Sequence, residues 1–456
     1  MTAHVFRSGS ALVTCTIVLV VVSAMAVGLA TLSGANLGIA DNQQKANRAF
    51  ANSESGLEIS RYWLSRVRVS SSTPPAHYFN TIISSVRHDL TDNNISNFQV
   101  NGDGTVPPVT LNSVGPQGFS GQWSSDAGNL AILRVLAVGS SGTAARTITV
   151  DYSIVPYHFA IFNYGIATKG ALRFPQNPTL TGATQNWEAD VYVQSDNNLV
   201  AVQVGGNASF AGDIDVGNGL ASVDFQGDVR IAGEQGQTAI DNHIKIGADP
   251  VEFPVPRVTD FKTYANGPVL DSTFTYNGSG VTLTNALLRA GTNPTFSGLG
   301  SVTIQGILYI ETPNVVTFAK NVSLQGLIVA EGDPNHMAGN AINFQANFAS
   351  TGYPAGAQFD ALRSQVGSSI LAPGSAVSFT GNFASVNGVL AAGSLFFSGN
   401  ANAVIKGTLI SYSPDPTVVQ GNISMSFDRA AMVEIPAGFD LYRVLNYDPG
   451  SYTMGN

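Results

Sequence analysis

The sequence predicts a mainly β protein: a long N-terminal membrane-spanning helix, then a small α+β segment, then a large parallel β-helix. Three observations predict this fold class. Residues 11–30 carry no charge, and twenty helical residues span about 30 Å, the thickness of a bilayer core. Glycine makes up 48 of the 456 residues, well above the usual ~7%, which suits tight turns between short strands. A glycine-centred strand pattern recurs from Gly306 to Gly326 and from Gly388 to Gly407, at spacings of 20 and 19 residues.

Composition narrows the classes of function. Charged residues make up only 11% of the chain, against roughly 25% in an average soluble domain, so a long helical bundle with charged faces is disfavoured. The 21 basic residues are outnumbered by 30 acidic ones and form no basic cluster, so no nucleic-acid partner is expected. The single cysteine, Cys15, excludes an internal disulfide and a cysteine-rich metal centre.

The N-terminal helix is expected to continue beyond the membrane. No charge occurs between Ser8 and Ala40 and no proline before Pro74, and apolar residues after Asp41 keep helical spacing. The pattern predicts a helix of about 55 residues, with 10–34 in the membrane and 35–68 as an amphipathic continuation. The alternative is a cleaved signal peptide that ends at a small-residue site near Ala26.

The same region resembles a known family. Arg7 and Gly9 precede Ser10-Ala11-Leu12, and about forty residues later comes the block 50–58, which holds Phe50, Glu54, Gly56 and Leu57. This segment is similar to a type IV prepilin and, more narrowly, to the N-terminal domain of the type IV pilus assembly protein PilX family. The resemblance implies that residues 1–9 are a leader, that prepilin peptidase cuts between Gly9 and Ser10, and that the new amine on Ser10 is methylated. Other pilin-like subunits and the lipid bilayer are then the expected partners.

One position departs from the family pattern. Most pilins carry a glutamate at the fifth residue after the cut, and this chain carries Thr14. A buried carboxylate in lipid needs a partner, and the pilin glutamate is thought to pair with the terminal amine of a neighbouring subunit. Thr14 cannot do so, although its hydroxyl can bond to a helix carbonyl. Two interpretations stay open: a subunit at the tip of a fibre, or a protein that never polymerises.

Residues 69–156 are expected to form a small α+β segment. Residues 77–90 place Ile82, Ile83, Val86 and Leu90 on one helical face. Residues 130–155 contain two β-rich stretches separated by a Ser-Ser-Gly-Thr-Ala turn, the pattern of an antiparallel hairpin. A small sheet that follows a long helix is similar to the headgroup of a pilin.

Residues 157–434 are expected to form the parallel β-helix. Each repeat has a phenylalanine, a turn, a strand, a glycine and a second strand, and stacked coils would bury a common core. Phe318 and Phe397 are expected in inward ladders, whereas a β-sandwich would not require this spacing. The region resembles β-helical domains attached to PilX-type N-termini and, more loosely, bactofilin repeats, on the segments 159–174 and 205–219.

Three stretches interrupt the repeat. Residues 249–268 hold four prolines and read as a loop across the coils. Residues 356–370 have helical spacing, with Phe359, Leu362, Val366 and Ile370 on one face. Residues 435–456 leave the repeat and are expected to form a cap or to fold back.

Catalytic chemistry is not expected. The densest acidic groups on the repeats are the pairs Asp213/Asp215 and Asp224/Asp228, and two opposed carboxylates are what a glycosidase needs. Acidic residues beside glycine are more often solvated turn positions. The six histidines are scattered without metal-ligand spacing, so neither a metal nor a cofactor is expected.

The sequence therefore predicts a structural protein: a minor pilin or pseudopilin of a type IV pilus or a type II secretion-like assembly. It would cross the cytoplasmic membrane once and display the β-helix outside the cytoplasm. The alternatives are a surface adhesin with a carbohydrate or other surface ligand and, less favoured, a β-helix enzyme that acts on polysaccharides.

Overall fold

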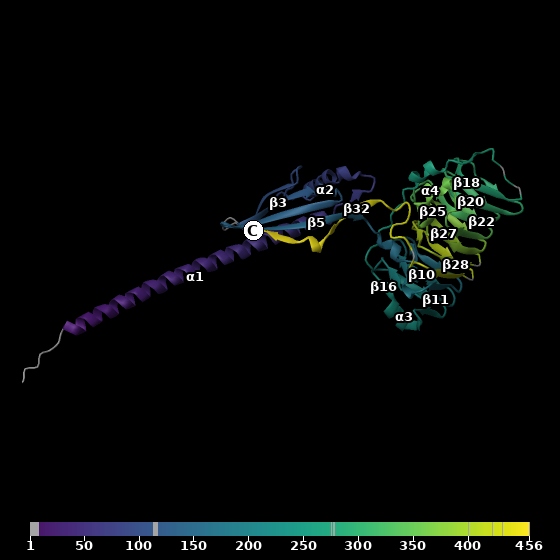
Figure 1. The fold of residues 1–456 in the computed structure, drawn as a ribbon. Coiled ribbons are helices and arrows are strands. Elements are labelled where there is room, and N and C mark those ends of the chain that lie inside the picture. The colour runs from purple at the N-terminus through teal and green to yellow at the C-terminus, as the bar shows by residue number, and fades with distance from the viewer. Residues whose placement is uncertain are drawn as a thin grey trace, which may run out of the picture. The chain divides into compact units, whose positions relative to one another are not determined.

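The computed structural model describes residues 9–112, 117–274, 276, 279–399, 401–421, 423–430 and 432–455. The chain divides into two compact units, which Figure 1 shows as ribbons. Unit 1 combines residues 1–156 with residues 442–456, and unit 2 is formed by residues 157–441. Unit 2 is therefore an insertion within unit 1, and the C-terminal residues return to the unit from which the chain started.

Unit 1 consists of two helices and one antiparallel sheet. The helix α1 runs unbroken over Gly9–Leu64, 56 residues, which confirms the expected long helix. The other elements are α2 (Tyr78–Asp92), β1 (Val69–Ser70), β2 (Thr105–Asn112), β3 (Gln117–Ser125), β4 (Ile132–Ser141), β5 (Ala144–Pro156), β32 (Tyr442–Tyr447) and β33 (Thr453–Gly455). The four predicted apolar residues of α2 are all buried, and β4 and β5 form the predicted hairpin.

The C-terminal tail completes the sheet of unit 1. The strand order is β1-β32-β5-β4-β3-β2, and β33 also pairs with β5. The strand β32 is antiparallel to β5, with Arg443 opposite Pro156. Unit 2 thus leaves and rejoins the sheet at two paired residues of neighbouring strands, the position that a hairpin turn would otherwise take.

Unit 2 is a parallel β-solenoid made of two runs. The N-terminal run, residues 166–246, contains β6 (Ile166–Thr168), β7 (Leu172–Phe174), β8 (Thr179–Gly182), β9 (Val191–Val193), β10 (Val200–Val204), β11 (Ala208–Phe210), β12 (Ile214–Val216), β13 (Ser222–Phe225), β14 (Val229–Ile231), β15 (Glu234–Gln235), α3 (Gly236–His243) and β16 (Ile244–Ile246).

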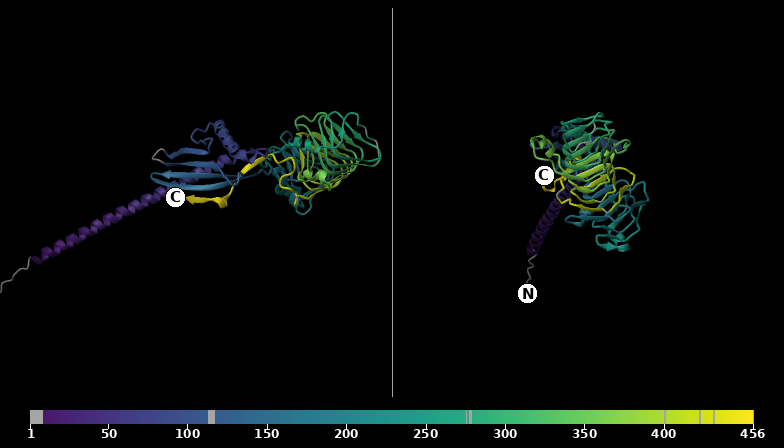
Figure 2. Two further views of the ribbon diagram at one scale, coloured as in Figure 1. Left: turned by 45° about the horizontal axis from the view of Figure 1, so that its top comes forward. Right: turned by 90° about the vertical axis from the view of Figure 1, so that its right-hand side faces the viewer.

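The C-terminal run, residues 269–427, contains β17 (Val269–Leu270), β18 (Val281–Leu288), β19 (Thr295–Phe296), β20 (Ser301–Ile310), β21 (Val315–Phe318), β22 (Asn321–Ala330), β23 (Ala341–Phe344), β24 (Phe348–Thr351), α4 (Asp360–Arg363), β25 (Ser368–Phe379), β26 (Phe383–Val386), β27 (Val389–Phe397), β28 (Ala401–Ile405), β29 (Leu409–Ser411), β30 (Thr417–Val419) and β31 (Ile423–Phe427). Figure 2 shows the stacked coils of both runs.

The order of the coils in space differs from their order in the chain. The chain enters at β6, winds to β16, crosses back in the segment 247–268, starts again at β17 and winds to β31. The last coil then stacks on the first, because β29 pairs with β6, β30 with β7 and β31 with β8, all in parallel. We call this junction the seam and residues 247–268 the strap. The strap agrees with the predicted loop across the coils, whereas the seam was not predicted.

The interior of the C-terminal run holds a ladder of phenylalanines. The rings of Phe296, Phe318, Phe344, Phe379 and Phe397 stack in sequence, with centroids 4.9–5.3 Å apart. Phe318 and Phe397 are 0% and 2% exposed, which confirms their predicted positions. A side-chain ladder of this kind fixes the register of each coil on the next.

The repeating glycines lie at the corner where each coil turns between two faces. Gly306, Gly326 and Gly388 all have positive φ. A Cβ at Gly326 would collide with the carbonyl oxygen of Gly306 in the preceding coil. Glycine satisfies both the backbone angle and the close stacking at these three corners, which explains why it recurs there.

One outer face of the coils is covered, so its strands are apolar on both sides. In β20 and β22, all residues from 306 to 310 and from 326 to 330 are buried. The strap and residues 433–438 lie over this face: Phe261 approaches Gly438, which lies against Leu371.

The segment 356–370 is only partly helical. A 3₁₀ turn (Ala357–Phe359) and α4 hold Phe359 and Leu362 buried as expected. The expectation is wrong for the other two residues: Val366 is 44% exposed, and Ile370 belongs to β25. Gly367, with φ +89°, ends the helical stretch, and pairing with β27 then draws residues from Ser368 onward into the sheet.

Candidate functional site

The first candidate site is the exposed half of α1. Among the described residues, α1 is the one helix long and apolar enough to cross a membrane. Its large apolar side chains from Leu12 to Ile39 are 47–74% exposed. Burying such a surface in lipid or against other helices is strongly favourable, at about 25 cal/mol per Å².

The residues of the predicted processing motif lie at the start of this helix. The helix begins at Gly9 and includes Ser10, while Arg7 lies outside the described residues. Thr14 is exposed within the apolar stretch. Two residues further on, the hydroxyl of Thr16 donates a hydrogen bond to the carbonyl of Leu12 at 2.8 Å, the kind of bond expected of threonine in a membrane helix.

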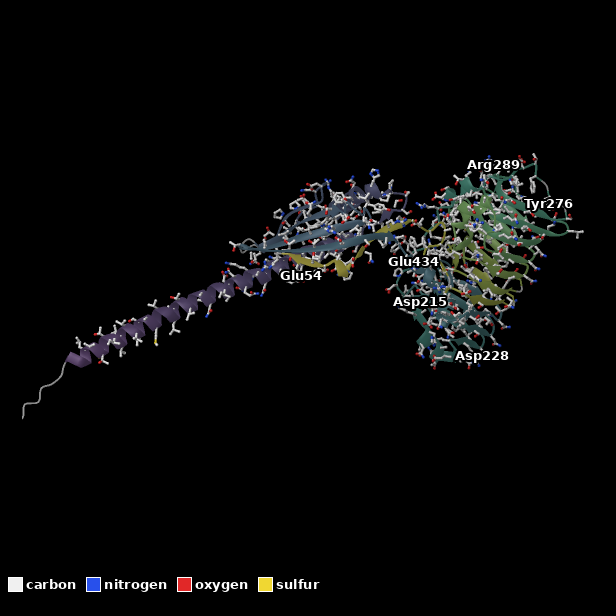
Figure 3. The ribbon with its side chains drawn as sticks, in the orientation of Figure 1. Glu54, Asp215, Asp228, Tyr276, Arg289 and Glu434 are labelled. Carbon is white, nitrogen blue, oxygen red and sulfur yellow. The ribbon has the colours of Figure 1, made fainter. Side chains whose placement is uncertain are left out.

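The block 50–58 is the place where α1 docks on the sheet of unit 1. Ser53 and Leu57 are 0% and 4% exposed, whereas Glu54, labelled in Figure 3, is exposed. A Cβ at Gly56 would lie 2.6 Å from the ring of Phe119 in β3. Phe50 is half-buried on the neighbouring turn.

A second glycine, from the sheet, completes this docking. Gly139 in β4 lies so close to α1 that a Cβ there would collide with Ala49 O and Ser53 N. The side chain of Asn52 donates a hydrogen bond to Ser140 O at 2.7 Å. The motif residues Ser53, Gly56 and Leu57 therefore seal one half of α1 onto the sheet, and the other half stays free to bind lipid or other helices.

The acidic pairs on the solenoid are engaged in hydrogen bonds. Asp215 accepts from Tyr164 Oη at 2.7 Å, and Asp213 lies 2.7 Å from His243 Nδ1. Asp224 accepts from Gln203, and Asp228 lies on another part of the same run, away from Asp215 (Figure 3). No group of three or more His, Cys, Asp or Glu side chains in the described part of the chain could hold a metal ion.

Asp190, which the sequence did not single out, lies near this group. Its Oδ1 accepts a hydrogen bond from Asp213 N at 2.8 Å, and burial raises its pKa to about 6. Since the folded pKa exceeds the unfolded value of 3.8, folding favours the protonated acid. The contribution of Asp190 to stability therefore falls as the pH rises from about 4 to about 6 and stays low above that range.

Asp190→Asn is expected to stabilise unit 2 at pH 7.5 by about 1 kcal/mol, because an amide keeps the acceptor without the charge and solvent screens part of the effect of the charge. At pH 4 the gain should vanish, since the carboxyl is then protonated in the folded wild type. Thermal unfolding at both pH values tests this. An equal gain at pH 4 would contradict the electrostatic cause.

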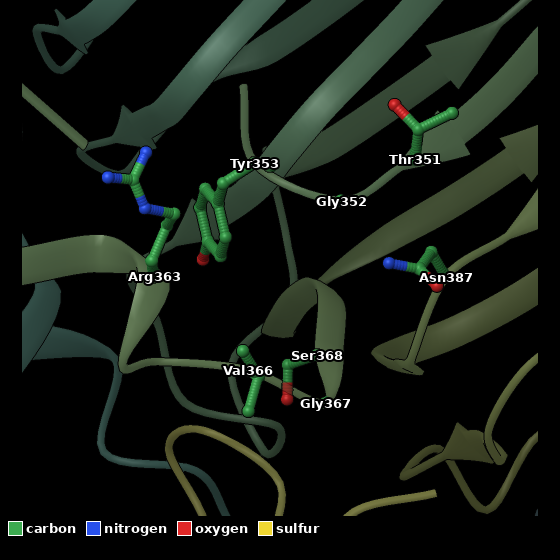
Figure 4. A pocket seen from close by; sticks show the side chains of 9 residues that line it. Thr351, Gly352, Tyr353, Arg363, Val366, Gly367, Ser368 and Asn387 are labelled. Carbon is green, nitrogen blue, oxygen red and sulfur yellow. The ribbon is translucent and has the colours of Figure 1, made fainter. Parts of the chain in front are cut away.

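A cleft opens on the C-terminal run beside the segment 352–367 (Figure 4). It encloses about 200 Å³, and its lining is Gly326, Thr351, Gly352, Tyr353, Arg363, Val366, Gly367, Ser368 and Asn387. The hydroxyl of Tyr353 donates to Gln365 O at 3.1 Å, and Arg363 is paired with Asp360. The cleft is therefore lined by an aromatic ring whose hydroxyl is hydrogen-bonded, by the backbone of glycines and by neutral polar side chains.

Comparisons with known proteins do not assign the chain to a family. No family model matches the chain, and no curated protein matches it either, so the PilX resemblance stays a prediction. One of the solved structures that match is the competence-associated pilin ComZ from Thermus thermophilus, with 13% identity and a TM-score of 0.22 over 90% of this chain and 97% of that chain. At this TM-score the two chains do not superpose as wholes, and the proposals below rest on the geometry described above.

Proposed function

We propose that this chain is a membrane-anchored, pilin-like structural protein, a minor pilin or pseudopilin of a type IV pilus or type II secretion-like assembly. The observation that carries the proposal is the division of α1 into an exposed apolar half and a half sealed on an antiparallel sheet. The exposed half gives the chain one membrane anchor and a surface for other pilin-like helices. Unit 2 is then displayed outside the cytoplasm.

Processing at the motif is the direct test. Gly9→Asp is expected to leave the leader attached, because a side chain and a charge at the cut site would obstruct the approach of prepilin peptidase to the backbone. Gly9→Ala, which adds one methyl group, is the matched control. The N-terminal sequence of the membrane-extracted protein gives the result, and wild-type protein should begin at Ser10.

Two outcomes would overturn this proposal. A wild-type N-terminus at Val27 would indicate removal of residues 1–26 as a signal peptide. A wild-type chain that still begins at Met1 in a host with an active prepilin peptidase would remove the pilin-like interpretation and leave a plain membrane anchor.

A second function is favoured by the cleft in Figure 4: unit 2 as a binding module for a neutral carbohydrate. The volume of about 200 Å³ suits one sugar ring. Among the described residues, the side-chain amide of Asn387 has no hydrogen-bond partner, so it can both donate to and accept from sugar hydroxyls. Tyr353 offers an aromatic surface, and pairing with Asp360 leaves Arg363 a poor site for an anion.

Binding of the full chain in detergent to an array of neutral and acidic glycans tests this function. Neutral glycans should be retained, and Asn387→Ala should weaken retention about tenfold by removing a pair of hydrogen bonds. Asn382→Ala, an exposed position in the adjoining turn, should bind like the wild type. Retention of acidic glycans alone, or equal binding by both variants, would contradict the proposal.

A further inference from the structure

The seam joins coils of two different runs, and in this it differs from the junctions between stacked coils within a run. Within a run, successive coils are joined directly by the chain, so coils that separate are quickly brought together again. The first and last coils are not consecutive in the chain: they are connected by the long path of the strap and the remaining coils, and by the two segments that lead to the paired residues Pro156 and Arg443. Separation at the seam therefore releases more conformational freedom than separation elsewhere.

The seam is also held by shorter stretches of paired strand than the junction between β20 and β22. The pairs β29–β6, β30–β7 and β31–β8 join three, two and four residues respectively. By contrast, β20 and β22 alone join ten residues in unbroken register. Less main-chain pairing is thus lost when the seam opens than when the coils that contain β20 and β22 part.

The aromatic ladder ends one coil before the seam. Phe397 is followed on the next coil by Val419, and Thr417 and Val418 pair with Leu172 and Arg173 across the seam. A valine offers no ring to stack on, so the dispersion contacts that join the C-terminal coils are weaker here.

Two devices hold the seam shut. The guanidinium of Arg429, just beyond β31, donates to Phe162 O at 2.9 Å and to Trp187 O at 3.3 Å in the N-terminal half of unit 2. Burial lowers the pKa of Arg429 to about 10, which still leaves it charged at neutral pH.

The strap is the second device, because it contacts both runs. The hydroxyl of Tyr192 in the N-terminal run accepts from Val251 N at 3.2 Å. The hydroxyl of Tyr412 in the C-terminal run donates to Pro254 O at 2.6 Å. Between these bonds, the ring of Phe253 lies 6.1 Å from that of Tyr192 and 6.5 Å from that of Tyr412.

We propose that the seam is the point at which unit 2 opens, with the strap and Arg429 as its latch. Opening divides the solenoid into its two runs, each of which keeps its own stacked coils. Both ends of unit 2 lie beside this junction: the ring of Phe162 is 5.0 Å from that of Phe439. The chain therefore enters and leaves unit 2 at the same place in the stack of coils, and the two coils that meet there are not consecutive in the chain.

Hydrogen exchange of the full chain tests the proposal. Amides of β6–β8 and β29–β31 are expected to exchange as one group, about tenfold faster or more than those of β20 and β22. A cross-link across the seam should abolish this difference. Thr179 and Ser424 are opposite each other in β8 and β31, and both are partly exposed, so Thr179→Cys with Ser424→Cys in a Cys15→Ala background provides it.

Oxidation of this double variant is expected to slow exchange at the seam about tenfold and to raise the melting temperature by about 5 °C. Thr179→Cys with Ser323→Cys is the matched control: Ser323 lies in β22 of the C-terminal run, several coils from the seam, and should form no intramolecular disulfide. Exchange at the seam as slow as in β20 and β22, or a cross-link without effect on exchange, would overturn the proposal. Both readouts are independent of membrane insertion and of processing at Gly9.

Discussion

Replacing Gly388 with alanine is expected to destabilise unit 2 by about 4 kcal/mol or more, enough to unfold it at moderate temperature. The φ of Gly388 is +116°, an angle that side chains disfavour. In addition, a Cβ there would lie 2.6 Å from the carbonyl carbon and oxygen of Gly367 and 2.7 Å from Ser368 N. These are backbone atoms of the neighbouring coil, and they cannot move aside without disturbing the strand pairing of that coil.

Gly291→Ala separates the two causes. Gly291 also has a positive φ, +77°, but no atom lies within 4 Å of its added Cβ. Only the backbone strain should remain, about 1–2 kcal/mol. Thermal and urea unfolding of the full chain measures both variants, and similar losses would show that the close stacking of the coils at Gly388 is not the cause.

Phe318→Ala is expected to cost about 3–5 kcal/mol. The ring is fully buried and stacks between Phe296 at 5.0 Å and Phe344 at 5.2 Å. Its loss removes two ring contacts and leaves a cavity that the rigid coils on either side cannot close.

Phe396→Ala is the matched control, because Phe396 is the outward neighbour of Phe397 in β27 and is partly exposed. This change should cost less than about 1 kcal/mol. Urea unfolding followed by circular dichroism compares the two variants. A Phe318→Ala protein as stable as the Phe396→Ala protein would mean that the ladder does not hold the coils in register.

Much of this fold could be read from the sequence because the forces that set it are local or periodic. An uninterrupted apolar stretch without proline predicts α1 wherever the rest of the chain lies. Phe318 stacks on Phe344 and Gly306 stacks on Gly326, so equivalent positions in successive coils need the same type of residue.

The candidate site was predicted less completely. The docking block 50–58 was recognised from its resemblance to a family, and the structure shows why Gly56 and Leu57 are suited to it. The cleft at Tyr353 and Asn387 was missed, because its lining comes from separate coils and an inserted segment. Asp190 was missed for the same reason: its altered pKa arises from burial, which has no local signal.

The sequence by itself determined the long anchor helix, the small sheet and the stacked parallel coils, since periodic apolar residues and glycines act over one or two coils. Only the tertiary structure decided which strands of these parts pair with one another. A tail at residues 442–447 adds a strand to β5, and β29–β31 dock on β6–β8 about 240 residues earlier in the chain. Parallel pairing uses main-chain hydrogen bonds and similar apolar side chains in every coil, so the residues of one coil do not specify which other coil it stacks on. The choice among them depends on the whole chain, because the two ends of unit 2 must meet the paired strands β5 and β32.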